Sequence, residues 1–401
     1  MREGGQARDA APAGDGFAVA HRIERYLGST ETFIYDTLVS LRRTRPIVIA
    51  SRFENLERFP LAKPAILKLS PPPRGTAAWA VSALARRLPG GRTHLEHLLR
   101  RERARLIHAH FGPAACDMVE TARRTGLPLV ASFYGYDASV GSVLEEFGAR
   151  YRGLFEMGTA ILVEGPIMAR RLESIGCPPV KIRLQRIGID LNRYRFHERA
   201  PAAGRPVRLL QCARMIPKKG FETTLKSLAL ARRGGSRVEL RLIGDGPLMP
   251  QLAELARELG LEGAVTFLGS QPREAFIREL DEADLYVQPS RTAEDGDTEG
   301  GAPTTILEAQ ASGLPILATR HADIPHIVRE GESALLSEEA DAPGLAANIS
   351  RLAADPALWA RMGRAGRAHV EAAHDARRLA HELESFYEER CAPSGGTRGA
   401  F

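Results

Sequence analysis

Residues 284–319 read DLYVQPSRTAEDGDTEGGAPTTILEAQASGLPILAT, and this stretch decides the fold. The apolar run at 285–287 is typical of a buried strand, and a polar loop rich in glycine and aspartate follows it. A helix is predicted from Pro303 until Gly313 ends it, and a second apolar run follows at 316–318. The order strand, loop, helix, strand is that of one unit in a parallel α/β sheet.

The start of the predicted helix is a candidate anion site. Pro303 suits the first helical position, because its ring fixes φ and its missing N–H would have no partner there. Ala302, at the expected N-cap, has no side-chain oxygen to bind the free amides of the first turn. The stretch is therefore a candidate phosphate-binding loop with a carboxylate, Glu308, on the same helix. The alternative is an ordinary turn between two strands of a buried sheet.

Length and composition describe a globular protein of two domains. The chain has 401 residues, of which 44% are hydrophobic and 26% charged. No run of eighteen apolar residues predicts a membrane span, and residues 1–16 lack the apolar core of a secretory signal. We expect residues 1–16 to be a disordered tail and residues 391–401 to be a second tail. The four cysteines are far apart without CxxC spacing, which favours the reducing cytosol and neither disulfides nor structural zinc.

Charge is divided unevenly between the two halves. Residues 1–200 hold 31 Lys and Arg against 20 Asp and Glu, whereas residues 201–401 hold 24 against 29. A predicted helix at 93–105, which follows another at 77–88, carries four arginines and an apolar face. Such a helix could lie on an anionic bilayer, so we expect peripheral contact with the inner face of the cell membrane. A solvated helix face is an equal alternative. Nucleic-acid binding is disfavoured, because few aromatic residues accompany the arginines.

Short apolar runs alternate with helical patterns along the chain, which predicts parallel sheets of the doubly wound type. In the first half, the strands are expected at 17–20, 47–50, 106–112, 129–132 and 160–163. Ligands of such sheets bind beyond the carboxyl ends of the strands. Four polar residues fall there: His110, Tyr134, Asp137 and Glu164.

The domain boundaries follow from the places where this periodicity is lost. We expect a first domain at 17–197, a linker at 198–206 and a second domain at 207–370. A helical pattern runs from 359 to 386. We expect its last part, as a C-terminal helix at 371–390, to pack back on the first domain.

The second domain offers cations to a cleft between the domains, where pockets are commonly found. Arg214 and Lys219 follow the predicted strand at 207–213, and Gly244 and Gly246 form a tight turn after the next strand. Convergent cations and free helix amides are the groups that hold a diphosphate. The segment from Asp295 to Asp297 has the DxD spacing of a metal-binding motif, and we interpret it as a loop coincidence, with no metal ligands expected in the chain.

Two sets of motifs together carry a family resemblance. The first set is Arg214 with Lys219-Gly220, the Gly244-Asp-Gly-Pro turn, Glu299-Gly, Glu308-Ala-Gln-Ala-Ser-Gly-Leu-Pro and Ile187-Gly-Ile-Asp190. It resembles the retaining nucleotide-sugar glycosyltransferases of family 4, which have the GT-B fold of two Rossmann-like domains facing across a cleft. The second set is Ser29-Thr-Glu-Thr-Phe, His108-Ala-His-Phe-Gly and Ser132-Phe-Tyr-Gly-Tyr-Asp. It is similar to the exopolysaccharide branch, typified by colanic-acid-type enzymes, and the resemblance covers residues 17–388.

The resemblance implies that the second domain binds the nucleotide-sugar donor. Arg214 and Lys219 would neutralise the diphosphate, and Glu308 would accept hydrogen bonds from the ribose hydroxyls. The other expected donor contacts are Gly244, Gly246, Gly300, Gly301, Ala302, Pro303, Thr304 and Thr305. Such enzymes need no metal, because fixed cations and helix amides stabilise the leaving group.

The resemblance also implies catalytic and acceptor-binding residues. The expected catalytic residues are Arg214, Lys219, Glu299, His110, Tyr134 and Asp137. The expected acceptor-binding residues are Ser29, Thr30 and Glu31.

Two departures from the family pattern bear on these roles. The two glutamates of the family lie eight positions apart, whereas Glu299 and Glu308 lie nine apart. Either the loop bulges by one residue, or Glu299 does not contact the donor sugar. At the second strand end, Tyr134 stands where the family has a histidine against the donor sugar. Its hydroxyl can donate a hydrogen bond but cannot serve as a base at neutral pH, and His110 is the nearest alternative.

We therefore predict a cytoplasmic retaining glycosyltransferase that uses a nucleoside diphosphate sugar, with UDP-sugar favoured. The expected acceptor is a hydroxyl of a glycan or lipid-linked glycan in the synthesis of exopolysaccharide or cell-surface polysaccharide. One alternative is transfer to a soluble small molecule, such as an antibiotic aminoglycoside. Another is a non-catalytic protein that binds nucleotide-sugar.

Overall fold

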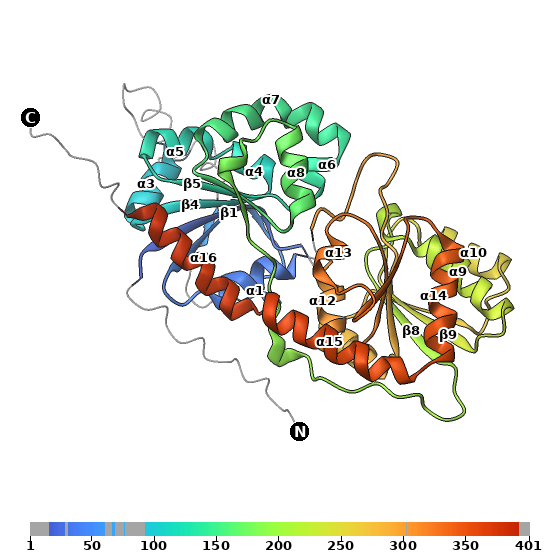
Figure 1. Ribbon diagram of the computed structural model, residues 1–401. Coiled ribbons are helices and arrows are strands. Elements are labelled where there is room, and N and C mark those ends of the chain that lie inside the picture. The colour runs from blue at the N-terminus through green and yellow to red at the C-terminus, as the bar shows by residue number, and fades with distance from the viewer. Residues whose placement is uncertain are drawn as a thin grey trace, which may run out of the picture.

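The computed structural model describes residues 16–28, 31–60, 66–68, 76, 93–301 and 303–392. Within them the chain forms two parallel sheets, each with helices on both faces (Figure 1). The predicted α/β architecture of two doubly wound domains is therefore confirmed. The predicted helix at 77–88 lies outside the described residues.

The first sheet has seven strands in the order β3-β2-β1-β4-β5-β6-β7. Its strands are β1 (Ala18–Tyr26), β2 (Arg45–Phe53), β3 (Ile66–Lys68), β4 (Ala104–His110), β5 (Leu129–Ser132), β6 (Ala160–Val163) and β7 (Ile182–Leu184). Its helices are α1 (Thr32–Ser40), α3 (His94–Arg101), α4 (Gly112–Cys116), α5 (Val119–Thr125), α6 (Tyr136–Ser139), α7 (Gly141–Met157) and α8 (Pro166–Ser174). Helices α4, α5, α7 and α8 cover one face, and α1 lies on the other (Figure 1).

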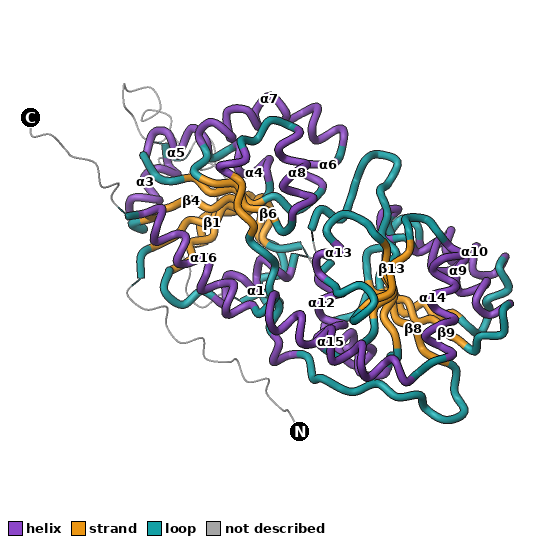
Figure 2. Tube along the Cα trace, viewed as in Figure 1, coloured by secondary structure: helices purple, strands orange, loops and turns teal. Residues whose placement is uncertain are grey.

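The second sheet has six strands in the order β10-β9-β8-β11-β12-β13. Its strands are β8 (Val207–Cys212), β9 (Val238–Ile243), β10 (Val265–Gly269), β11 (Leu285–Gln288), β12 (Ile316–Thr319) and β13 (Ala334–Ser337). Its helices are α9 (Phe221–Arg233), α10 (Met249–Glu258), α11 (Arg273–Glu282), α12 (Thr304–Ala311), α13 (Ile324–Ile327), α14 (Ala342–Ala354) and α15 (Ala357–Ala373). Loops from both domains meet between the two sheets (Figure 2).

The last helix, α16 (Ala376–Cys391), crosses from the second domain to the first (Figure 1). Its apolar side chains Leu383, Phe386 and Tyr387 join the core cluster built on β1 and β4. The buried carboxylate of Glu384 accepts hydrogen bonds from the backbone N–H groups that precede β2, including that of Thr44 at 2.8 Å. The first domain is thus closed by a segment from the far end of the chain.

Two predicted helices have different bounds. The pattern at 359–386 is not one helix, because α15 ends at Ala373 and Asp375 caps α16 by accepting from the N–H of Arg378 at 2.8 Å. The chain turns there to pass between domains. The basic helix predicted at 93–105 ends at Arg101, because residues from Ala104 onward pair with β1 as strand β4.

The predicted linker at 198–206 lies after the point where the chain changes domain. Arg199 is buried in the second domain and donates hydrogen bonds to the carbonyls of Ala283 and Ser312 at 3.1 and 2.7 Å. Tyr194 already contacts Glu308 of α12. The chain therefore crosses to the second domain before Tyr194. The position of the crossing depends on which side chains are buried in the second domain, and the local sequence does not indicate this.

Candidate functional site

A cleft of about 1090 Å³ lies between the two domains. The first domain lines it with Glu31, Tyr134 and Glu164, among others. The predicted donor-binding residues that line it are Arg214, Lys219, Gly244, Gly246, Pro303, Thr304, Thr305 and Glu308, and Glu299 lies with them. The structure thus brings most of the predicted residues to one cleft.

Lys219 reaches the cleft from a short 3-10 turn, η3 (Pro217–Lys219), which follows β8. Gly220 comes next with φ of 66°, and a Cβ there would lie 1.8 Å from the carbonyl oxygen of Pro289. Nζ of Lys219 lies 2.5 Å from Oε2 of Glu299. Burial lowers the pKa of Lys219, and the charge of Glu299 opposes that shift. A carboxylate therefore holds the ammonium group at the wall of the cleft.

Glu299 is bound on both carboxylate oxygens, and its side chain is only 4% exposed. Its Oε1 accepts hydrogen bonds from Ser290 at 2.5 Å and Gln288 at 3.3 Å. Burial would raise the pKa of Glu299, but Lys219 and Lys218 outweigh it and hold that pKa at about 2. Glu299 is therefore ionised at neutral pH, as the partner of Lys219.

The loop between the two glutamates contains a tight turn at Gly300. The N–H of Gly301 donates to the carbonyl of Glu299 at 2.9 Å, and Gly300 has φ of 74°. A hydrogen bond over three residues takes up chain length, and Glu299 lines the cleft beside this turn. Gly300 also lies against the first domain, where an added Cβ would come within 2.2 Å of the Cα of Gly135.

Lys218 is a residue that the sequence reasoning missed. Its Nζ donates to Oδ1 of Asp297 at 2.8 Å and to the carbonyl of Thr298 at 2.7 Å. Asp297 belongs to the segment that mimics a DxD motif, and its carboxylate is occupied by this lysine. Lys218 fixes the loop that carries Glu299, a contact between residues 79 positions apart that no local pattern signals.

The glycine turn packs on the loop that carries Arg214. Gly244 has φ of 137°, and a Cβ there would lie 1.8 Å from the carbonyl oxygen of Ala213. The N–H of Met215 donates to the carbonyl of Asp245 at 2.8 Å, which joins the two loops. Arg214 is exposed beside them at the cleft. Its guanidinium is therefore available to an anion that enters there.

Helix α12 begins one residue later than predicted. Pro303 is its N-cap, with ψ of 109°, and no side chain in the described part of the protein caps the first turn. Thr304 and Thr305 form that turn at the cleft, while Ala302 lies outside the described residues. An uncapped helix start with its positive dipole end at a cleft suits a negatively charged ligand.

Glu308, one turn further along α12, is buried and already has two partners. Its Oε1 accepts hydrogen bonds from the hydroxyl of Tyr194 at 2.6 Å and from Arg273 at 3.0 Å. Burial raises the pKa of Glu308, and the charge of Arg273 opposes this. The sequence reasoning found Glu308 but missed both partners, because neither lies near it in the chain.

Of the predicted acceptor-binding residues, Glu31 is described, whereas Ser29 and Thr30 lie outside the described residues. Glu31 lines the cleft just before α1, and its Oε2 accepts a hydrogen bond from the N–H of Gly28 at 3.0 Å. One oxygen of its carboxylate therefore fixes the loop between β1 and α1.

Asp137 has a structural task in the first domain. Its two oxygens accept hydrogen bonds from the N–H groups of Gly112, Tyr134 and Gly135 at 2.9 to 3.1 Å. Burial raises the pKa of Asp137 to about 6, although these hydrogen bonds lower it. The carboxylate is fully buried and joins the loops after β4 and β5, so it positions those loops rather than facing the cleft.

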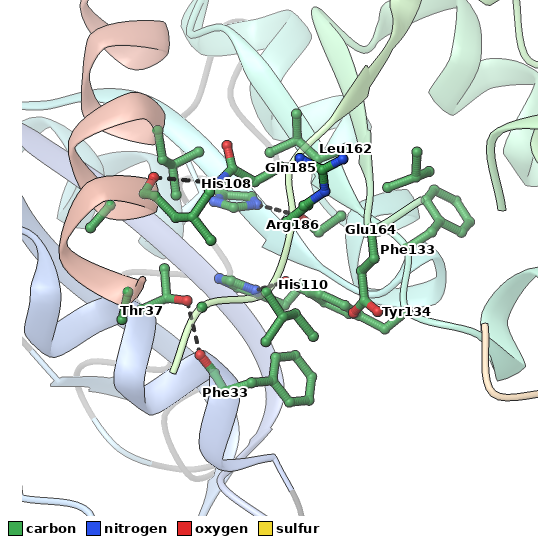
Figure 3. Close-up of a pocket in the computed structure, with 18 residues that line it drawn as sticks. Phe33, Thr37, His108, His110, Phe133, Tyr134, Leu162, Glu164, Gln185 and Arg186 are labelled. Atoms are coloured by element: carbon green, nitrogen blue, oxygen red, sulfur yellow. Dashed lines mark hydrogen bonds between the residues drawn. The ribbon is translucent and has the colours of Figure 1, made fainter. Parts of the chain in front are cut away.

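His110 and Tyr134 are hydrogen-bonded to each other beside a cavity of about 30 Å³ (Figure 3). Nδ1 of His110 lies 2.8 Å from the hydroxyl of Tyr134, and Nε2 of His110 lies 3.2 Å from Nδ1 of His21. Nε2 of His21 is buried and has no hydrogen-bond partner among the described residues, so it is the unprotonated nitrogen, because a buried orphan N–H costs more than an orphan lone pair. His21 therefore donates to His110, and His110 donates to Tyr134.

His21, His108 and His110 together form a buried cluster in which one ring nitrogen of each histidine lies within 4.8 Å of the other two. A metal ion must lie in the plane of each ring that binds it. The planes of His108 and His110 are stacked at 29° with centroids 4.4 Å apart, so they do not converge on one ion. The predicted strand at 17–20 had ended before His21, which hid its pairing with His108.

A second contact between domains lies at the start of α8. Asp323, in the loop after β12, accepts hydrogen bonds from the N–H groups of Ile167 and Met168 at 2.8 and 3.1 Å. The second domain thus caps a helix of the first. Beside it, an added Cβ on Gly301 would meet Glu164. These contacts hold the two walls of the cleft together.

Comparisons with known proteins agree with this arrangement. Residues 30–193 match the family described as Glycosyltransferase Family 4, and residues 192–369 match Glycosyl transferases group 1. A Salmonella typhimurium protein named for colanic acid biosynthesis, WcaL, is 35% identical over 60% of this chain and 60% of its own length. The Erwinia amylovora amylovoran biosynthesis glycosyltransferase AmsK is 34% identical over 66% of this chain and 65% of its own. The chain thus spans less than two thirds of these relatives.

A more distant relative and a solved structure complete the comparison. A GDP-mannose-dependent phosphatidylinositol monomannoside mannosyltransferase of Mycolicibacterium smegmatis is 28% identical over 66% of this chain and 73% of its own length. The crystal structure of Anabaena Alr3699/HepE with UDP superimposes with a TM-score of 0.73 at 16% identity, covering 93% of this chain and all of that one.

Family matches to both domains, two facing Rossmann-like sheets and the shared cleft lead to one conclusion. The chain belongs to the family 4 glycosyltransferases and has their GT-B fold.

Proposed function

We propose that this protein transfers a sugar from a nucleoside diphosphate sugar to an acceptor hydroxyl, with retention of anomeric configuration. The observation that carries the proposal is the meeting of Arg214, Lys219, the uncapped start of α12 and Glu308 at one cleft. Retention rests on the family resemblance alone.

The chemistry suits these groups. The bond between the anomeric carbon and the diphosphate breaks, the acceptor oxygen bonds to that carbon, and the proton of the acceptor hydroxyl passes to the departing diphosphate. Negative charge develops on the departing diphosphate, and cations fixed in place stabilise it without reorganising. Glu308 lies five residues beyond Pro303, about 7 Å along a helix, which suits the span from diphosphate to ribose.

A metal ion has no role in this proposal, because Arg214, Lys219 and the first turn of α12 line the cleft where the diphosphate would bind. We expect transfer to continue unchanged in excess EDTA. Loss of transfer in EDTA, with recovery on adding Mg²⁺ or Mn²⁺, would contradict this part of the proposal.

We propose UDP-sugar as the donor. The structure of HepE was solved with UDP, which supports this choice, whereas the relative named for GDP-mannose supports the other base. A thermal-shift screen of nucleoside diphosphates and their sugars separates them, because ligand binding raises stability by RT ln(1 + [L]/Kd). A shift selective for GDP would overturn the choice of base and keep the reaction.

We propose a glycan or lipid-linked glycan as the acceptor, in the synthesis of exopolysaccharide at the cytoplasmic face of the membrane. The names of the colanic acid and amylovoran relatives support this pathway. Among the described residues, no helix is long and apolar enough to cross a bilayer. The basic first half motivates peripheral binding, and binding to vesicles that ignores both anionic lipid and salt would remove that support.

The decisive experiment is a transfer assay with the matched donor and a panel of acceptors. Transfer to lipid-linked glycan supports the proposal, whereas transfer only to small soluble acceptors would favour the alternative substrate class. Donor binding without any transfer or hydrolysis would favour a non-catalytic nucleotide-sugar-binding protein.

A further inference from the structure

A chain of ion pairs links the two domains through Glu308. Arg273, at the start of α11 in the second domain, lies 3.0 Å from Oε1 of Glu308 and 3.4 Å from Oδ2 of Asp36. Asp36 belongs to α1 of the first domain, and its Oδ1 pairs with Arg193 at 2.9 Å. Tyr194, next to Arg193, donates to Oε1 of Glu308. A carboxylate in each domain thus shares one arginine.

Because its carboxylates are buried, this network of ion pairs is sensitive to the loss of any one of its residues. The side chains of Asp36 and Glu308 are 3% and 6% exposed. Buried charges are costly unless they are paired, so removing one partner disturbs the positions of the others. Among the described residues, the buried Nε of Arg273 has no hydrogen-bond partner, and all three hydrogen bonds that Arg273 donates come from Nη2. Its position therefore depends on Asp36, Tyr194 and Glu308.

The carboxylate of Glu308 is oriented by this arrangement. Both hydrogen bonds that it accepts within the described residues go to Oε1, which leaves Oε2 for a ligand in the cleft. A carboxylate that is hydrogen-bonded through one oxygen presents its other oxygen at a fixed position. A side chain held in place by its neighbours to within a fraction of an ångström binds a ligand most effectively.

We propose that Asp36 and Arg273 are positioning residues for ribose recognition, so that the first domain contributes to donor affinity without touching the donor. This inference rests on the proposed function, in which Glu308 binds the ribose hydroxyls. Donor affinity and the placement of α1, whose first residues line the cleft, are then coupled through Arg273.

The test compares two ligands in the absence of acceptor. Isothermal titration measures the affinity of the full chain for UDP and for 2′,3′-dideoxy-UDP, which lacks the hydroxyls that Glu308 would bind. GDP and its dideoxy form replace them if the thermal-shift screen selects guanine. Wild-type protein should bind the dideoxy ligand more weakly than the parent nucleotide.

Asp36→Asn and Arg273→Gln should each weaken binding of the hydroxylated nucleotide on the order of 5- to 20-fold, at the low end of typical couplings between sites. Binding of the dideoxy nucleotide should be nearly unchanged in both variants, because the contact that they position is then absent. The double variant should lose less than the two single losses multiplied together, since both act through one carboxylate.

The matched control is Arg241→Gln, which breaks another partly buried Arg–Glu pair in the same domain, with Glu279 at 2.5 Å. It should lower stability and leave the preference for the hydroxylated nucleotide unchanged. Equal weakening of both nucleotides in Asp36→Asn and Arg273→Gln, or no weakening, would overturn the inference. If wild-type protein binds neither nucleotide, the proposed function fails first, which is a distinguishable result.

Discussion

The two walls of the cleft differ in how their polar groups are held. In the second domain, Lys219 and Glu299 pair as ions, and Arg214 is exposed to the cleft. In the first domain, His110 is neutral because burial lowers its pKa to about 3. The carboxylate of Asp137 accepts hydrogen bonds from backbone amides. The second domain presents paired and exposed cations, whereas His110 and Asp137 form a buried scaffold behind the other wall. The charged residues with which the first domain lines the cleft carry both signs: Arg25, Glu31, Arg58 and Glu164.

This difference indicates that the two domains bind different parts of the substrates. A diphosphate needs fixed positive charge, which the second domain supplies. An acceptor hydroxyl and a sugar are neutral, so the first domain needs shape and hydrogen bonds more than charge. Substitutions on each side of the cleft test this difference between the two domains.

Lys219→Ala should lower the rate of transfer on the order of 10²- to 10³-fold, because one fixed group that stabilises transition-state charge is lost. A steady-state transfer assay measures this. Lys226→Ala, which removes an exposed lysine paired with Glu222 on α9, is the control and should retain activity. If both variants keep wild-type activity, the positive charge of Lys219 does not contribute to the rate of transfer.

Gly300→Ala should destabilise the protein by about 1–3 kcal/mol from its positive φ alone, and more from its contact with the other wall. The added Cβ would lie 2.2 Å from the Cα of Gly135. Gly331→Ala is the matched control, because Gly331 has φ of 79° with nothing within 4 Å of the added Cβ. Urea unfolding should show the smaller loss for Gly331→Ala, and donor affinity should fall only in Gly300→Ala.

The pH dependence of stability should have opposite signs in the two walls. The pKa of Glu299 is lowered to about 2, because Lys219 and Lys218 outweigh the effect of burial, so its contribution is present above pH ~4.5 and is lost as the pH falls toward 2. The contribution is no more than ~3 kcal/mol, and burial of Lys219 offsets part of it. The destabilisation measured for Glu299→Gln should therefore shrink from pH 7 to pH 3.

Asp137 provides the opposite case. Burial raises its pKa to about 6, so its contribution is greatest below pH ~3.8 and is lost as the pH rises through 6. The stability difference between wild-type and Asp137→Asn should fall over that rise. Urea unfolding at pH 3 to 7 measures both variants, and slopes of the same sign would refute the proposed contrast.

Tyr134→Phe should have the smallest effect on the rate of transfer. It leaves the buried Nδ1–H of His110 without its acceptor, at a cost of about 1–3 kcal/mol in stability. If the first wall is mainly a scaffold, kcat should fall by less than about tenfold, the equivalent of 1.4 kcal/mol. A loss as large as that of Lys219→Ala would show instead that the Tyr134 hydroxyl takes part in the chemistry.

Sequence reasoning succeeded where a residue's role follows from its neighbours in the chain. The strand at 285–287, the glycine loop and the helix that carries Glu308 all have local signatures, and their order predicts the fold. The start of α12 was predicted one residue early, because the choice between N-cap and first helical residue for Pro303 depends on ψ, which proline does not fix.

Contacts over long separations were not predictable in this way. Lys218 and Asp297, or Asp36 and Arg273, are charged residues like many others in the sequence, and only folding places them together. His21 of β1 gave no strand signal, because Tyr387, one of the side chains that packs beside it, belongs to α16 at the far end of the chain.

The sequence by itself determined two parallel α/β domains, a donor wall rich in cations and glycine, and a departure from the family at Tyr134. These follow from periodicity and turn chemistry, which act over a few residues. The tertiary structure alone decided the partners of Glu299 and Glu308, the scaffold task of Asp137 and the histidine chain behind Tyr134. Each depends on burial and on which distant charge lies nearest, and those are properties of the packed chain.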